Sequence, residues 1–102
     1  HKDGWMSDGY MEAIESSWQN IKKVIDSLPE DYTVIITADH GGHDRLHGTD
    51  LSEDMTIPII INGENFEAGK VLKNANIKDI APTVTKLLDA EPDDEWEGKS
   101  IL

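Results

Sequence analysis

Hydrophobic residues recur at helical spacing near both ends of the chain. From Asp8 to Leu28 the apolar side chains are three or four positions apart, which is typical of a helix with one apolar face. Its N-cap falls at Ser7 or Asp8, and Pro29 ends it. The same spacing predicts a second helix over residues 76–88. We therefore expect two amphipathic helices whose main role is packing.

Between the helices lie two runs rich in β-branched residues. Residues 32–38 are almost continuously apolar, which fits a strand buried on both faces, as in a parallel sheet covered by helices. Residues 56–62 predict a second buried strand, and Pro58 favours an edge or an irregular start for it. Residues 70–72 could form a third, short strand. This order of elements predicts an α/β fold, with the polar segment 39–55 after the first strand as the candidate site.

Composition and charge exclude several classes of function. The 102 residues include 9 basic and 21 acidic side chains, a net charge of −12, and no cysteine. Such a chain cannot neutralise a nucleic-acid backbone and is repelled by an anionic membrane surface. Disulfide and thiolate chemistry are excluded, and no apolar run approaches the roughly 18 residues of a membrane span. We expect one domain, or part of one.

The polar segment carries a cluster of possible metal ligands. His40, His43 and His47 fall within eight residues, directly after Asp39. Imidazole and carboxylate suit zinc, manganese and iron. The glycines at 41–42 are expected to give the backbone the freedom to turn both Asp39 and His40 toward one cavity. The alternative is an exposed turn that binds no metal, and spacing alone does not decide between the two.

Five blocks of sequence, in order, resemble the carboxyl-terminal part of the alkaline phosphatase superfamily, and within it the type I phosphodiesterase and nucleotide pyrophosphatase branch. They are Thr-Ala-Asp-His-Gly-Gly at 37–42, Leu-His-Gly-Thr at 46–49, Glu-Asp-Met-Thr-Ile-Pro at 53–58, Asp-Ile-Ala-Pro-Thr at 79–83 and Trp-Glu-Gly-Lys-Ser at 96–100. The resemblance implies a three-layer α/β sandwich with a mostly parallel sheet. Residues 1–102 would then be the carboxyl-terminal part of a metal-dependent phosphodiesterase or phosphatase catalytic domain.

The resemblance also implies a site with two divalent ions, zinc or alternatively manganese, and a Ser or Thr nucleophile that lies outside this chain. Asp39 and His40 match the pair that binds one ion. His47 and His1 match ligands of the other ion. This chain would thus hold about half of the ligands and no catalytic nucleophile.

Other polar residues of the segment have weaker assignments. His43 has no counterpart in the family motif and is interpreted as facing the substrate or lying just behind the ligands. Arg45 could contact a phosphate, although a solvated loop residue is the simpler interpretation. Asp50 and Asp54 are interpreted as residues that cap turns.

The leading hypothesis is a two-metal hydrolase of phosphate esters or phosphodiesters whose substrate is a small phosphate ester or nucleotide. Two alternatives come from the same superfamily: a sulfatase, which would normally carry a single calcium ion, and a phosphosugar mutase, whose third histidine usually lies farther from the Asp-His-Gly block. A third alternative is a non-catalytic α/β fragment without metal.

Without a nucleophile, the isolated chain should be inactive. An exposed strand edge would let it self-associate.

Overall fold

The computed structural model describes residues 2–102, which form two compact units, one ending at Ile61 and one running from Asn62 to Leu102. The first unit begins with helix α1 (Asp8–Ser27). Ser7 caps this helix, because its side chain accepts a hydrogen bond from the Tyr10 amide at 3.3 Å. Leu28 is extended and ends the helix just before Pro29. The helix predicted from the apolar spacing is confirmed to within one residue.

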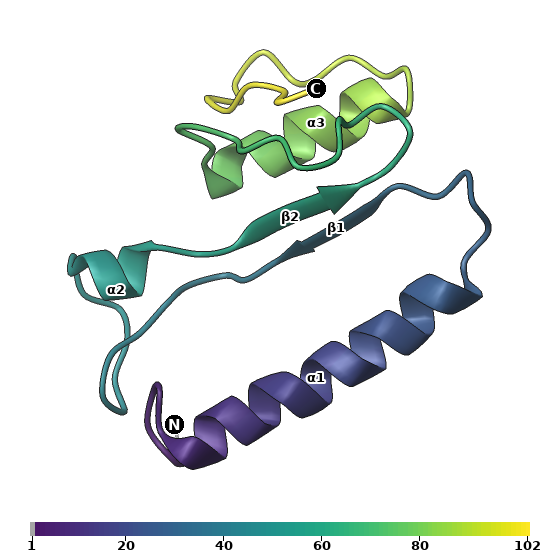
Figure 1. Ribbon diagram of the computed structural model, residues 1–102. Coiled ribbons are helices and arrows are strands. Elements are labelled where there is room, and N and C mark those ends of the chain that lie inside the picture. The colour runs from purple at the N-terminus through teal and green to yellow at the C-terminus, as the bar shows by residue number, and fades with distance from the viewer. Residues whose placement is uncertain (1) are drawn as a thin grey trace. The chain divides into compact units, whose positions relative to one another are not determined.

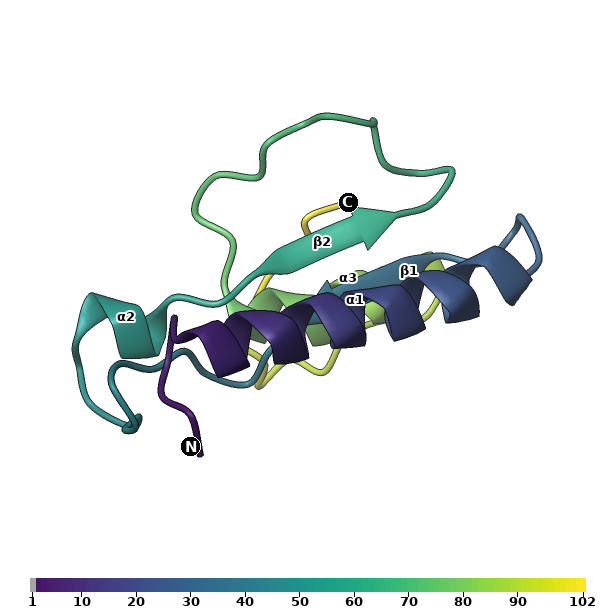
Figure 2. The ribbon, with the colours of Figure 1, turned by 60° about the horizontal axis from the view of Figure 1, so that its bottom comes forward.

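The first unit also contains a two-stranded sheet. Strands β1 (Val34–Thr37) and β2 (Ile59–Asn62) pair with each other, and a single helical turn, α2 (Ser52–Met55), lies in the connection between them (Figures 1 and 2). The two arrows point in opposite directions (Figure 1). Thr37 Oγ1 donates a hydrogen bond across the pair to the Pro58 carbonyl at 2.8 Å.

This pair corrects the expected sheet. Both strands are shorter than predicted, they run antiparallel, and every residue of β1 is at least partly exposed. The physical reason is that the pairing continues into the connection: the Gly41 and Gly42 amides donate to the Asp54 and Glu53 carbonyls, so the chain returns alongside itself in the opposite direction. The α/β class is retained, and the three-layer sandwich with a mostly parallel sheet stays a prediction.

The second unit is organised around a capped helix. A short 3₁₀ helix, η1 (Ile77–Asp79), leads into helix α3 (Ile80–Leu87). A capping box begins it: the Asn76 side chain accepts from the Lys78 amide at 3.0 Å, and the Asp79 side chain accepts from the Asn76 amide at 2.8 Å. The predicted helix over 76–88 is therefore confirmed, with a tighter first turn. Residues 70–72 lie outside any strand.

The carboxyl-terminal tail is tied to α3 by one buried hydroxyl. Thr83 is fully buried; its Oγ1 donates to the Asp79 carbonyl at 2.6 Å and accepts from the Ile101 amide at 3.1 Å. Gly98 lies so close to this helix start that a Cβ there would come within 1.9 Å of the Lys78 carbonyl oxygen. The tail thus packs by backbone approach rather than by large apolar side chains.

Residues 2–102 do not form a hydrophobic core. None of the described hydrophobic residues with large side chains is fully buried, and the buried side chains that carry polar groups are Asp54 and Thr83. Trp18 on α1 remains 44% exposed and Ile60 on β2 49% exposed. None of the helices in this part of the chain is long and apolar enough to cross a lipid bilayer. Since burial of apolar surface is the dominant force in folding, these residues by themselves gain little from it.

We predict that a polypeptide of these 102 residues, made on its own, unfolds gradually. Small domains unfold sharply because they bury apolar surface in one cooperative step, and this polypeptide buries little of it. Circular dichroism during heating should show a broad slope, and the dye ANS should bind to the exposed apolar face of α1. A sharp transition without dye binding would contradict this prediction.

Candidate metal centre

The candidate site is the connection between β1 and β2, held closed by a short continuation of their pairing. The Gly41 amide donates to the Asp54 carbonyl at 2.8 Å, and the Gly42 amide donates to the Glu53 carbonyl at 2.8 Å. These two bonds bring the residues that follow β1 against α2. Residues far apart in the sequence therefore become neighbours at the site.

Close packing explains the two glycines of the motif. A Cβ on Gly41 would lie 2.0 Å from the Glu53 carbonyl oxygen, and one on Gly42 would lie 2.1 Å from the Trp5 ring. Neither glycine adopts a positive φ. The expectation that they supply backbone freedom was wrong: these positions need glycine because there is no room for a side chain.

Three of the four predicted metal ligands lie close together. The Asp39 carboxylate Oδ2 is 3.8 Å from His40 Nε2, and the His40 ring stacks on the His47 ring with centroids 4.0 Å apart and planes 19° apart. His1, the fourth predicted ligand, lies outside the described residues. Within residues 2–102, no three carboxylate or imidazole groups converge into a complete metal site.

The hydrogen bonding of His40 leaves one ring nitrogen suited to a metal. Its Nδ1 lies 2.7 Å from the Gly41 carbonyl oxygen. A carbonyl only accepts, so Nδ1 carries the proton and Nε2 of the neutral ring keeps its lone pair. That Nε2 and the nearby Asp39 carboxylate are the groups that would hold a divalent ion here. The donor set thus fits a metal in chemical type, as half of a ligand shell.

Asp54 is a buried polar group of the loop and is only 3% exposed. Its Oδ1 lies 2.6 Å from His43 Nδ1, while its Oδ2 accepts from the Thr49 amide at 2.8 Å and from Thr49 Oγ1 at 2.7 Å. The hydrogen bond from His43, followed by those from Thr49, lowers the pKa of Asp54 to about 2. The same hydrogen bond to Asp54 raises the pKa of His43 above its ordinary value.

This carboxylate corrects the interpretation of Asp54 as a simple turn cap. It does accept the Thr49 amide, but it also forms a buried pair with His43, which sequence reasoning did not connect to it. The partners are eleven positions apart, beyond the range of helix or turn rules. These residues could have been paired from the sequence only by assuming that the chain returns antiparallel after β1. A parallel sheet was expected instead.

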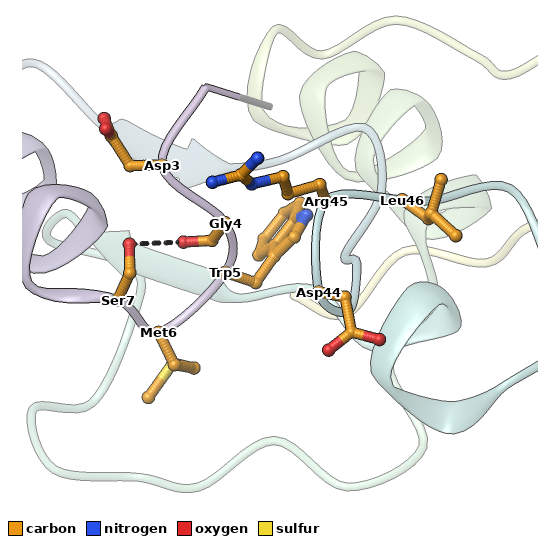
Figure 3. Close-up of a pocket in the computed structure, with 8 residues that line it drawn as sticks. All are labelled: Asp3, Gly4, Trp5, Met6, Ser7, Asp44, Arg45 and Leu46. Atoms are coloured by element: carbon orange, nitrogen blue, oxygen red, sulfur yellow. Dashed lines mark hydrogen bonds between the residues drawn. The ribbon is translucent and has the colours of Figure 1, made fainter.

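Arg45 lies at the tip of a tight hairpin beside an open cavity. His43 and Leu46 exchange two backbone hydrogen bonds, of 3.0 and 2.8 Å. The cavity, of about 620 Å³, is bounded by residues 3–7 and 44–46, and the Arg45 side chain extends over Gly4 and Trp5 (Figure 3). The Asp44 carboxylate points away from the guanidinium (Figure 3). The expectation that Arg45 faces a substrate stays a prediction.

Comparison with known proteins identifies the family. Residues 4–92 match the family described as the metalloenzyme superfamily. The chain belongs to the metalloenzyme superfamily. The resemblance to the alkaline phosphatase superfamily is thereby confirmed at the level of the superfamily.

Curated relatives of this metalloenzyme chain are mutases. It is 29% identical over 99 residues to a 2,3-bisphosphoglycerate-independent phosphoglycerate mutase of Clostridioides difficile, covering 90% of the chain and 19% of the relative. It is 31% identical over 94 residues to a phosphopentomutase of Idiomarina loihiensis, covering 92% of the chain and 23% of the relative. A phosphopentomutase of Alkaliphilus metalliredigens is 32% identical, with coverage of 91% and 23%.

The chain therefore spans about a fifth of the length of these relatives. No solved structure matches it. The names of the relatives agree with the mutase alternative and do not single out the phosphodiesterase branch, so the histidine spacing that was expected to disfavour a mutase is a poor discriminator.

We predict that the loop between β1 and β2 is most stable between about pH 4 and 6.5. The depressed pKa of Asp54 means that its stabilisation is complete above its ordinary value of 3.8 and is lost as the pH falls through about 2. The raised pKa of His43 means that its stabilisation is complete below 6.5 and is lost as the pH rises through the raised value. Amide protection factors of Gly41 and Thr49 measure this.

The control for this pH dependence is Asp54→Asn. Without the carboxylate, the loss of protection as His43 deprotonates should disappear. An unchanged profile in this variant would show that another group controls the loop.

We also predict that Gly41→Ala destabilises the loop far more than Gly48→Ala. The first change forces a Cβ against the Glu53 backbone, which cannot move aside easily, whereas nothing lies within 4 Å of a Cβ at Gly48. Gly48 has a φ of 91°, so alanine there costs only backbone strain, about 1–3 kcal/mol. Thermal melting of both variants in the full-length protein tests this, and equal losses would refute the packing explanation.

Proposed function

We propose that this chain contributes metal-binding and substrate-facing groups to a longer, metal-dependent enzyme that transfers the phosphoryl group of a small phosphate ester. Membership of the metalloenzyme superfamily supports the metal dependence. The observation that carries the proposal is the arrangement of Asp39, His40 and His47 after β1: the Asp39 carboxylate lies 3.8 Å from His40 Nε2, and the His40 ring stacks on the His47 ring.

The geometry of the cluster supports the assignment of two ions rather than one. The His40 and His47 rings are nearly parallel, so they present their nitrogens side by side instead of toward one point. In this proposal Asp39 and His40 hold one ion, while His47, with His1, holds the other.

The residues of the chain have separate tasks in this proposal. The Gly41 carbonyl fixes the His40 ring by accepting a hydrogen bond from Nδ1–H, which leaves Nε2 as the nitrogen that would bind a metal. The Asp39 carboxylate adds negative charge beside it and is 89% exposed. When bound, the ions would polarise the phosphoryl oxygens and activate a hydroxyl nucleophile supplied by another part of the protein. Asp and His accept both zinc and manganese; we propose zinc.

Two reaction types use such a site. The first candidate is a hydrolase of phosphate esters or phosphodiesters, similar to nucleotide pyrophosphatases, in which water takes the phosphoryl group. The second is a phosphosugar mutase, in which another hydroxyl of the same sugar takes it. The similarity to two phosphopentomutases and a phosphoglycerate mutase favours the second candidate.

Metal analysis of the full-length protein tests the proposal. We expect about two divalent ions per chain in the native protein and about one fewer in Asp39→Asn, His40→Ala and His47→Ala, because each change removes a ligand. Asp50→Asn is the matched control, an exposed carboxylate of the same loop, and should keep the native metal content. Native metal content in all three ligand variants would favour the alternative in which the loop binds no metal.

Activity assays then separate the two reactions. A hydrolase should release nitrophenol from a nitrophenyl phosphodiester. A mutase should move the phosphate within a pentose phosphate without releasing inorganic phosphate. Failure of both reactions in the metal-loaded protein would refute phosphoryl transfer as the function.

A further inference from the structure

His43 and Asp54 form a pair that the metal assignments do not use. The Asp54 side chain is 1% exposed and the His43 side chain 24% exposed. A charged carboxylate is buried at a large cost unless its oxygens are hydrogen-bonded. Here both oxygens are satisfied, one by His43 and the other by Thr49. The carboxylate is thus fixed in place before any ligand arrives.

This arrangement fixes the orientation of the His43 ring. Its Nδ1 is engaged by Asp54 Oδ1 at 2.6 Å. Its backbone amide and carbonyl are both bonded to Leu46 in the hairpin. Only Nε2 is left for another partner. A carboxylate that holds one imidazole nitrogen and leaves the other for chemistry is the arrangement used by metal-binding and catalytic histidines.

His43 belongs to the same loop as two of the proposed metal ligands. It lies three residues after His40 and four before His47, and the stacking of those two rings closes the loop from which the His43 hairpin extends. The raised pKa of His43 favours an imidazolium, in which Nε2 donates a hydrogen bond. Charge-assisted donors of this kind bind phosphoryl oxygens strongly.

We propose that His43 is a catalytic residue whose Nε2 donates a hydrogen bond to a phosphoryl oxygen of the substrate, and that Asp54 is the positioning residue that aims it. This inference rests on the proposed function. It goes further by naming a third type of contact at the site, a protein donor to the phosphoryl group in addition to the two ions. Because the donor is fixed by a buried partner, it strengthens binding of the transition state without reorganising.

Two amide substitutions at His43 separate this role from a purely structural one. The Asn side chain places an NH₂ near the position of Nδ1, so His43→Asn keeps a donor to Asp54 and removes the outer one. The Gln side chain places its NH₂ near the position of Nε2, so His43→Gln keeps the outer donor and loses the inner one. A structural role needs the inner donor, whereas our proposal needs the outer one.

The assay uses the full-length, metal-loaded protein and whichever phosphate ester it turns over. We expect kcat of His43→Asn to fall about 100-fold with KM nearly unchanged, as when one donor to a developing oxyanion is removed. His43→Gln should keep more activity, within about tenfold of native. Asp54→Asn should lower kcat, because the His43 ring loses the carboxylate that orients it. Asp50→Asn, the control, should match the native enzyme.

Metal content, thermal melting and phosphate affinity complete the test. If His43→Asn keeps the native metal content and the native melting temperature, its loss of kcat does not come from a lost metal ligand or from a damaged fold. Inorganic phosphate should bind more weakly to this variant than to the native protein. If esters are turned over but His43→Asn matches native, or if His43→Gln is the more damaged variant, the inference is overturned and the proposed function stands. If the native protein neither turns over esters nor binds phosphate, both are overturned together.

Discussion

The conformation of the candidate site depends on one buried carboxylate. Asp54 accepts three hydrogen bonds, from His43 Nδ1 and from the amide and hydroxyl of Thr49. These bonds fasten the residues after β1 to those before α2, in a part of the chain that has no hydrophobic core to do so. Backbone hydrogen bonds from Gly41 and Gly42 link the same two sides, so the buried carboxylate adds side-chain contacts to a connection that the backbone begins.

The proposed phosphate chemistry has to be reconciled with the acidity of the chain. A net charge of −12 repels anions at long range, but local charge decides what a site binds. At this loop the Asp54 carboxylate is buried, and its oxygens are satisfied by His43 and Thr49. In the function that we propose, Asp39, His40 and His47 would attract cations, and the cations would then attract the phosphate.

The elements of the fold were predictable where a local rule specifies them. Apolar spacing and Ser7 located α1, and the Asn76 capping box fits the start of the second helix. The direction of β2 was not predictable from its apolar run, because the same run fits parallel and antiparallel neighbours. The hydrogen bonds from Gly41 and Gly42 decide it, and these join positions more than ten residues apart.

By itself, the sequence determined the residue types that can bind metal, their order along the chain and the family that their motifs indicate. The residue types marked a cluster of possible ligands, and the resemblance to the superfamily assigned Asp39, His40 and His47 among them. Only the tertiary structure decided that Gly41 and Gly42 are present for lack of space, and that His43 is hydrogen-bonded to the buried Asp54. The physical reason is that close approach and burial arise between segments distant in sequence, so no local pattern records them.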